Sequence, residues 1–417
     1  MNKILYENLA IEWILAIKEK IKKESFLRYW PDFTPFPFAF YDDHQVYLCN
    51  HPSPPEGFRN VGEFFQGPRD SRFFGNTSIM LEGVPTAIVD LTLLTPDNEI
   101  AQLFSLIVHE MYHSYQHSVG YQRGSNEFLY LRYPQTKENI ALRLMERKAL
   151  LSALFTQEKT EKLAFVDQFF AYRESRRKRI GDYLTYELGQ ESVEGLATYV
   201  ESKAYREGTG LPEPFLLGHF CKNLYEPQGT LFDLRKSCYS SGLAISYLLD
   251  DFIPDWKREY MASSSFLYDY FLGKMERKIS VDDPPVDPET ERKASFLFQK
   301  ETDKRDGEFA KFYSSKGYLI TIEGSLKIQG FDPMNLLPKG NQLLHKRFLK
   351  VLINGDTFVF NQSCVTQMTG EGLDCNKLQF FTPQLPEMLG ETIQIGTFPP
   401  MKGTWSQEGR EITIKLS

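Results

Sequence analysis

Residues 103–118, which read LFSLIVHEMYHSYQHS, constrain the fold of this chain more than any other stretch. Within them, His109 and His113 are four residues apart, and Glu110 follows the first histidine. Side chains four apart on a helix lie on one face, so both imidazoles can point at one metal ion with Glu110 beside it. This H-E-x-x-H pattern is what a catalytic zinc site takes from a single helix. The alternative is two ordinary helix histidines that have this spacing by chance.

Two further features of the sequence favour the zinc interpretation. Three of the seven histidines fall between positions 109 and 117, which is an uneven distribution. The apolar run 106–108 directly before the motif indicates that the helix is buried. We therefore expect Zn2+ as the cofactor, held on a buried helix.

The composition argues against several classes of protein. The 417 residues carry a net charge of -7 without a long basic stripe, which argues against a nucleic-acid partner. No run reaches the roughly 18 apolar residues of a membrane span, and residues 1–23 have the pattern of an amphipathic helix rather than a signal peptide. The five cysteines are scattered without a C-x-x-C pair, which favours reduced thiols and a cytoplasmic location.

The order of the predicted elements indicates an α+β fold. We expect a mainly helical domain with a small N-terminal β-sheet over 1–280, an acidic, proline-rich linker over 281–293, and a small, mainly β domain over 294–417. The predicted strands span 38–48, 77–91, 318–328, 348–360 and 391–397, with a turn at Glu82-Gly83 and a hairpin over 403–416, whereas 49–76 is expected to be irregular. The predicted helices span 96–120, 139–155, 161–180, 182–206, 237–251, 255–275 and 293–312, and Thr95-Pro96-Asp97 is the expected start of the motif helix.

A zinc site on the motif helix needs a third protein ligand from elsewhere, commonly Glu, His or Asp. Zinc peptidases with three histidine ligands require Gly at position 116 and His at 119, but this chain has Gln116 and Val119. His117 lies eight residues after His109, which is about 12 Å along a helix and too far for one metal. His117 is therefore expected to line the cleft, to support a ligand or to be exposed, and the third ligand must come from another segment.

The acidic run 191–201, which reads ESVEGLATYVE, offers such a ligand. Its part EGLATYVE resembles the E-G-x-A-x-Y-x-E helix of the aminopeptidase N-like family, whose members are gluzincins and bind zinc through H-E-x-x-H and the first Glu of this helix. The resemblance implies that Glu194 is the third ligand, with Glu191, one turn earlier, as the alternative. An acidic helix face without a metal is the other interpretation. The small residues Gly195 and Ala197 are expected to let this helix approach the motif helix closely.

The segment YSSG that begins at Tyr239 resembles the Y-x-x-G segment of the same family, which implies that the Tyr239 phenol stabilises the transition state. Tyr239 as a plain core aromatic is the alternative, and Tyr199 and His219 are the next candidates. Two features depart from the family: 80 residues separate His113 from Glu194, and there is no G-x-M-E-N strand to hold the amino terminus of a substrate. The resemblance covers three short motifs and implies a gluzincin rather than an aminopeptidase.

The sequence therefore predicts a zinc metallopeptidase, a hydrolase that acts on a peptide or protein substrate. Glu110 is the expected general base, which takes a proton from water and passes it to the leaving amine, while Tyr239 donates to the oxyanion. The strand at 77–81 is the expected edge for pairing with a peptide. The alternative is a non-catalytic binding or scaffold protein that retains a gluzincin-like metal site. Retention of Glu110 argues against this alternative, because structural zinc sites need no general base.

Overall fold

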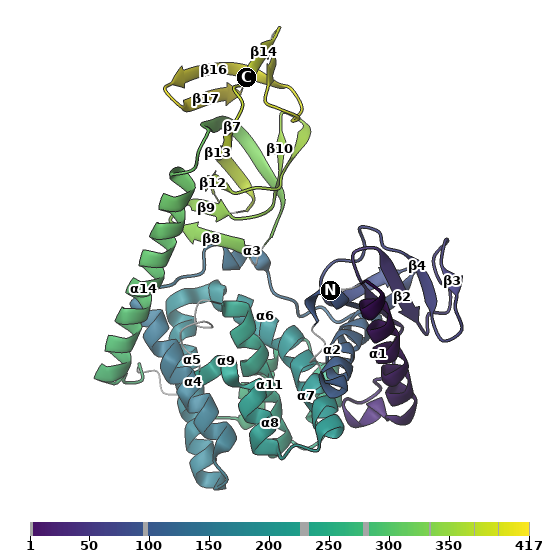
Figure 1. The fold of residues 1–417 in the computed structure, drawn as a ribbon. Coiled ribbons are helices and arrows are strands. Elements are labelled where there is room, and N and C mark those ends of the chain that lie inside the picture. Colours follow the sequence, from purple (N-terminus) through teal and green to yellow (C-terminus); the bar gives the residue numbers. More distant parts are fainter. Residues whose placement is uncertain are drawn as a thin grey trace. The chain divides into compact units, whose positions relative to one another are not determined.

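The computed structural model describes residues 3–94, 99–225, 233–277, 283–332, 335–370, 372–390 and 392–416. It is an α+β structure with a helical middle and a β-sheet near each end of the chain, which confirms the predicted fold class (Figure 1). The chain divides into two compact units. Unit 1 is Met1–Asn126 with Glu138–Glu291, and unit 2 is Glu127–Lys137 with Arg292–Ser417.

Unit 1 begins with a six-stranded sheet in the order β3-β4-β2-β1-β6-β5. Its strands are β1 Phe38–Tyr41, β2 Gln45–Cys49, β3 Arg59–Asn60, β4 Phe65–Pro68, β5 Thr77–Leu81 and β6 Val84–Asp90. All four residues of β1, which reads FAFY, are buried, and the strand has an antiparallel neighbour in β2 and a parallel one in β6. Among the described strands, β5 pairs with β6 alone and so forms one edge of the sheet.

The predicted strand regions of unit 1 are found, together with two strands that were not expected. Region 38–48 forms the β1–β2 pair, and region 77–91 forms β5 and β6 around a turn in which Glu82 and Gly83 both have positive φ. The prediction that 49–76 is irregular is wrong at β3 and β4. These short strands are defined by their pairing, β4 with β2 and β3 with β4, and not by a pattern of their own.

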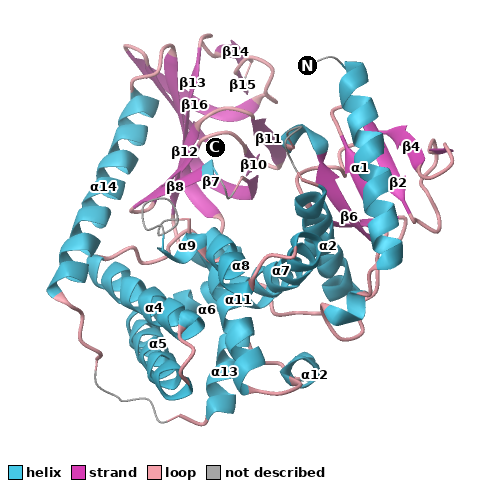
Figure 2. Cartoon of the chain, turned by 60° about the horizontal axis from the view of Figure 1, so that its bottom comes forward, coloured by secondary structure: helices cyan, strands magenta, loops and turns pink. Residues whose placement is uncertain are grey.

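Helices make up the rest of unit 1. They are α1 Lys3–Lys23, η1 Phe26–Arg28, η2 Leu91–Leu93, α2 Ile100–Ser118, α4 Lys137–Phe155, α5 Lys159–Ile180, η3 Gly181–Tyr183, α6 Leu184–Gln190, η4 Glu191–Gly195, α7 Leu196–Thr209, α8 Glu213–Phe220, α9 Lys222–Tyr225, α11 Leu234–Phe252, α12 Trp256–Ala262 and α13 Leu267–Met275. The motif helix α2 packs against β5, β6 and α7, and α7 packs in turn against α11. Figures 1 and 2 show α2, α7 and α11 side by side. In the described parts of the chain, every helix is too short or too polar to cross a bilayer.

The predicted helices are largely found, with three differences. The expected start of the motif helix at 95–97 lies outside the described residues, and the described helix begins after Glu99, which forms a capping box with Gln102. The predicted helix 182–206 is not one regular α-helix, because the π-helical segment η4 interrupts it. The predicted helix 255–275 is two helices, α12 and α13, since Ser263 and Phe266 have extended backbone angles.

Unit 2 is built on an 11-stranded sheet. Its elements are α3 Glu127–Tyr130, most of α14 Pro288–Tyr313, β7 Tyr318–Phe331, β8 Leu336–Lys339, β9 Gln342–His345, β10 Leu349–Ile353, β11 Asp356–Phe360, β12 Cys364–Met368, β13 Asp374–Thr382, β14 Glu387–Leu389, β15 Thr392–Gln394, β16 Met401–Glu408 and β17 Glu411–Leu416. The long strand β7 pairs with β13, β10 and β17, and its side chains enter a large apolar core. α14 begins at Pro288, within the segment expected to be a linker, and the predicted domain limits stay a prediction.

Candidate metal centre

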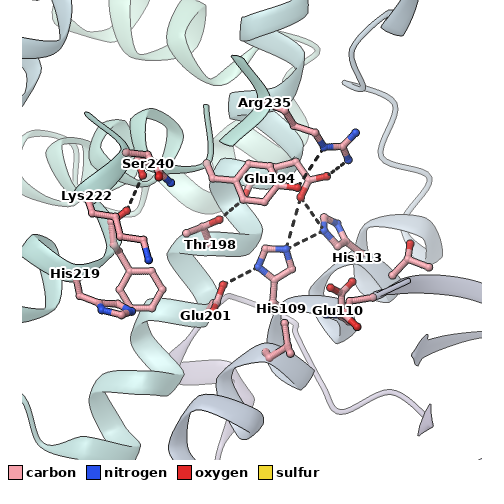
Figure 3. A pocket seen from close by; sticks show the side chains of 16 residues that line it. His109, Glu110, His113, Glu194, Thr198, Glu201, His219, Lys222, Arg235 and Ser240 are labelled. Carbon is pink, nitrogen blue, oxygen red and sulfur yellow. Dashed lines mark hydrogen bonds and ion pairs between the residues drawn. The ribbon is translucent and has the colours of Figure 1, made fainter. Parts of the chain in front are cut away.

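The fold brings His109, His113 and Glu194 together at one point inside unit 1 (Figure 3). The two imidazole Nε2 atoms are 3.2 Å apart, and the Oε2 atom of Glu194 lies 3.6 Å from Nε2 of His109 and 3.3 Å from Nε2 of His113. Ligand atoms that surround a tetrahedral ion at about 2.0–2.1 Å lie about 3.3 Å from one another. The spacing of these three atoms therefore fits a metal ion of that size.

A carboxylate orients the first histidine. Glu201, two turns after Glu194 along η4 and α7, places its Oε2 atom 2.9 Å from Nδ1 of His109. A carboxylate on Nδ1 fixes the imidazole so that Nε2 is left to bind a metal, and it raises the basicity of the ring. The sequence reading missed Glu201, although its spacing from Glu194 places both on one face of the helix.

An amide orients the second histidine. Gln116 accepts a hydrogen bond from Nδ1 of His113 at 2.8 Å, and its Nε2 donates to the carbonyl oxygen of Val193 at 3.2 Å. One side chain thus holds His113 and ties the motif helix to the segment that carries Glu194. The glutamine that rules out the three-histidine class therefore supports a ligand here, and its i+3 position after His113 is the signal that could have revealed this.

Glu194 lies in η4, a π-helical turn between α6 and α7. At its end, Gly195 approaches Gly242 of α11 so closely that a Cβ added to Gly195 would be 2.5 Å from the Cα atom of Gly242. The expectation that Gly195 allows close approach to the motif helix is thus wrong about the partner, which is α11. Single π-helical turns within α-helices are frequent at functional sites. This turn sets where the Glu194 side chain points.

The alternative ligand Glu191 is held in a different environment. It is fully buried, pairs with Arg173 through two contacts of 2.8 Å, and accepts a hydrogen bond from Ser241 at 2.5 Å. Arg173 also pairs with Glu146 at 2.6 Å. Glu191 therefore belongs to a buried ion-pair network, and Glu194 is the glutamate that joins the two histidines.

The three residues of the metal centre shift one another's pKa values strongly. Burial lowers the pKa of His109 and His113, but the surrounding carboxylates together outweigh it and raise both pKa values: Glu194, Glu201 and Glu110 act on His109, and Glu194 and Glu110 act on His113. Burial alone raises the pKa of Glu194, but the two histidines outweigh it and hold that pKa well below its usual range. The negative charge of Glu194 thus favours positive charge on the two histidines. A divalent cation is favoured at the same place, where it competes with protons for the imidazole nitrogens.

Glu110 lines the same pocket as the three metal-centre residues, a cavity of about 440 Å³. Its side chain is buried, and burial raises the pKa of its carboxyl group, against the opposing effect of His109 and His113. A buried carboxylate with a raised pKa is suited to accept and return a proton. The pocket therefore combines a possible metal centre with a possible general base.

Two residues of α11, Arg235 and Tyr239, also line the pocket. The ring of Tyr239 stacks against His109 with centroids 6.1 Å apart. Arg235, one turn before Tyr239 on the same face, donates from Nη2 to Oε1 of Glu194 at 2.7 Å and from Nε to the Tyr239 hydroxyl at 3.3 Å. The sequence analysis assigned no role to Arg235. Its position four residues before Tyr239 places both side chains on one face of α11 and could have indicated one.

The other candidates from the sequence are placed differently. His219 lines the pocket and stacks on Tyr205, with centroids 5.6 Å apart. Tyr199 is buried and donates its hydroxyl to Asp250 at 2.6 Å, so its phenol is engaged outside the metal centre. His117 is exposed at the end of α2.

The donors at this centre are two imidazole nitrogens and one carboxylate oxygen, a set that suits zinc and other first-row divalent ions. The geometry thus describes a buried group that can hold a metal ion without choosing among these metals. Comparisons of the chain with protein-family models, with curated proteins and with solved structures found no match, so an assignment of function rests on the residues of this site.

Proposed function

We propose that this protein is a zinc-dependent hydrolase of gluzincin type that cleaves peptide bonds. The observation that carries the proposal is the position of Glu110, which lines the same pocket as the group His109, His113 and Glu194. A site that serves only to hold a structural metal is closed by protein ligands and has no use for a buried base at an open pocket.

Zinc, when bound by these three residues, lowers the pKa of water and polarises a carbonyl group. Glu110 takes a proton from the attacking water and delivers it to the nitrogen of the leaving amine. Tyr239 donates its hydroxyl proton in a hydrogen bond to the oxygen that becomes negatively charged. Glu201 and Gln116 keep the imidazoles oriented throughout, because each holds one Nδ1 atom.

A peptide substrate has a suitable place to bind along β5. This strand is at the edge of the sheet, so its outward backbone groups are available for pairing with an extended chain. Asn76, directly before β5, and Thr77, its first residue, both line the pocket. A peptide that pairs with β5 therefore passes the metal centre, which supports a peptidase over other kinds of hydrolase.

The proposal is tested by measuring bound metal and then hydrolysis of a mixed peptide library. We expect about one zinc ion per chain and peptide cleavage, and we expect Glu110→Gln to keep the metal while turnover falls at least about a hundredfold, because only the base is removed. Glu56→Gln, which changes an exposed glutamate outside the pocket, is the matched control and should retain activity. A metal-bound protein that cleaves no peptide would instead favour the binding or scaffold alternative.

A further inference from the structure

Arg235 shares the carboxylate of Glu194 with the metal centre. Its Nη2 atom lies 2.7 Å from Oε1 of Glu194, whereas Oε2 of the same carboxylate faces the two histidines (Figure 3). The Arg235 side chain is one-third exposed and reaches the carboxylate from the pocket side. One carboxylate oxygen of Glu194, the expected third ligand, is therefore paired with the positively charged side chain of Arg235.

A guanidinium in this position opposes metal binding. Arginine keeps its charge at every pH at which proteins function, so it repels any divalent cation held by Oε2 of the same carboxylate. The hydrogen bond also draws electron density from the carboxylate and makes it a weaker donor. The charge of Arg235 therefore lowers metal affinity, while its hydrogen bond orients Glu194, and the net effect on zinc binding distinguishes the two roles.

Arg235 makes a second contact in the pocket. Its Nε atom lies 3.3 Å from the hydroxyl oxygen of Tyr239, and the Tyr239 ring stacks on His109. Because residues 235 and 239 are one turn apart on α11, the guanidinium faces Glu194 and Tyr239 at the same time. The two contacts connect the third ligand to the group expected to meet the oxyanion.

We propose that Arg235 is a positioning residue that sets the charge of the metal centre. By taking up part of the negative charge of Glu194, it leaves more positive charge on a bound divalent ion, for water and for the substrate carbonyl. The same guanidinium holds the Tyr239 hydroxyl beside the centre. The inference rests on the proposed metal-dependent function and extends it to a residue outside the ligand set.

The test is the zinc affinity of the full chain, measured by competition with a chelating dye. We expect Arg235→Met to bind zinc about tenfold more tightly than wild type, because a nearby positive charge is removed, and Arg235→Lys to stay close to wild type. Lys222→Met is the matched control, since Lys222 also lines the pocket but on the side away from Arg235, and its zinc affinity should stay within twofold of wild type (Figure 3). A residue that only clamps Glu194 gives the opposite sign, with weaker zinc binding in Arg235→Met.

A further readout separates the possible outcomes. The visible absorption of the Co2+-loaded protein should change in Arg235→Met and not in Lys222→Met. Arg235→Gln gives a second neutral variant if the methionine variant does not fold. A wild type that binds no metal defeats the proposed function itself. A metal-binding wild type whose Arg235 variants bind zinc no more tightly, or whose Lys222 variant shows the same gain, defeats this inference alone.

Discussion

At the scale of single residues, Glu191 and Glu194 lie in one π-helical turn but have opposite environments. We expect Glu194→Ala to lose most of the bound metal with little loss of stability, because Glu194 faces the histidines at the pocket. Glu191→Ala should keep the metal but lose about 3 kcal/mol of unfolding free energy, since it leaves the buried Arg173 with a single carboxylate partner. Metal analysis with thermal unfolding of both variants checks this pair. Loss of metal in Glu191→Ala alone would move the ligand assignment one turn upstream.

The residues of the metal centre differ in how far the sequence could predict them. His109, Glu110 and His113 follow from spacing on one helix, because the distance that matters is set within a single element. Glu201 and Arg235 were not assigned, since their roles come from contacts between helices that are far apart in the chain; His109 and Glu201, for example, are 92 positions apart. Side-chain pattern predicts which face a residue occupies, but the neighbouring helix decides what it meets there.

At the scale of elements, the contact between Gly195 and Gly242 fixes the π-helical turn. A Cβ at Gly195 would lie 2.5 Å from the Gly242 Cα atom, and backbone cannot move aside as a flexible side chain does. We expect Gly195→Ala to lose about 1–3 kcal/mol of unfolding free energy and to weaken metal binding, because α11 must shift away from the turn that carries Glu194. Gly218→Ala in α8 is the control, since nothing lies within 4 Å of its added Cβ and alanine favours helix there. Equal stability of the two variants, by denaturant unfolding, would contradict the packing argument.

The elements themselves were predicted where one physical pattern governs a whole segment. The motif helix, α4, α5 and α11 follow apolar periodicity, and β5 and β6 are two apolar segments joined by the turn at Glu82 and Gly83. The π-helical turn could not be predicted from the sequence, because its residues contact partners far along the chain, Gly195 against Gly242 of α11 and Glu191 against Arg173. Strands β3 and β4 were missed for the same kind of reason, since pairing with a neighbour defines them.

At the scale of the whole molecule, the two units have separate cores and separate acid-sensitive groups. In unit 1 the buried carboxylates Glu146 and Glu187 depend on arginine partners, which outweigh burial and hold their pKa values below the usual range. In unit 2, His345 at the end of β9 is 1% exposed, and its Nε2 atom is 3.0 Å from the hydroxyl of Thr366 on β12. These groups sit in different packing environments, each within its own unit.

The last prediction concerns unit 2. Burial lowers the pKa of His345 to about 3, against about 6.5 in an unfolded chain. The unfolded state therefore binds the proton first, so the stability that neutral His345 contributes is fully present above pH 6.5 and is lost as the pH falls toward 3. The expected loss is about 1.4 kcal/mol for each pH unit in this window.

Hydrogen exchange of the β9 and β12 amides, measured at several pH values and corrected for intrinsic exchange rates, checks this expected loss of stability. His345→Gln, which can still hydrogen-bond to Thr366 but does not titrate, should remove this slope. If the wild type and the glutamine variant lose protection in parallel between pH 6.5 and 4, His345 is not the group that makes unit 2 sensitive to acid.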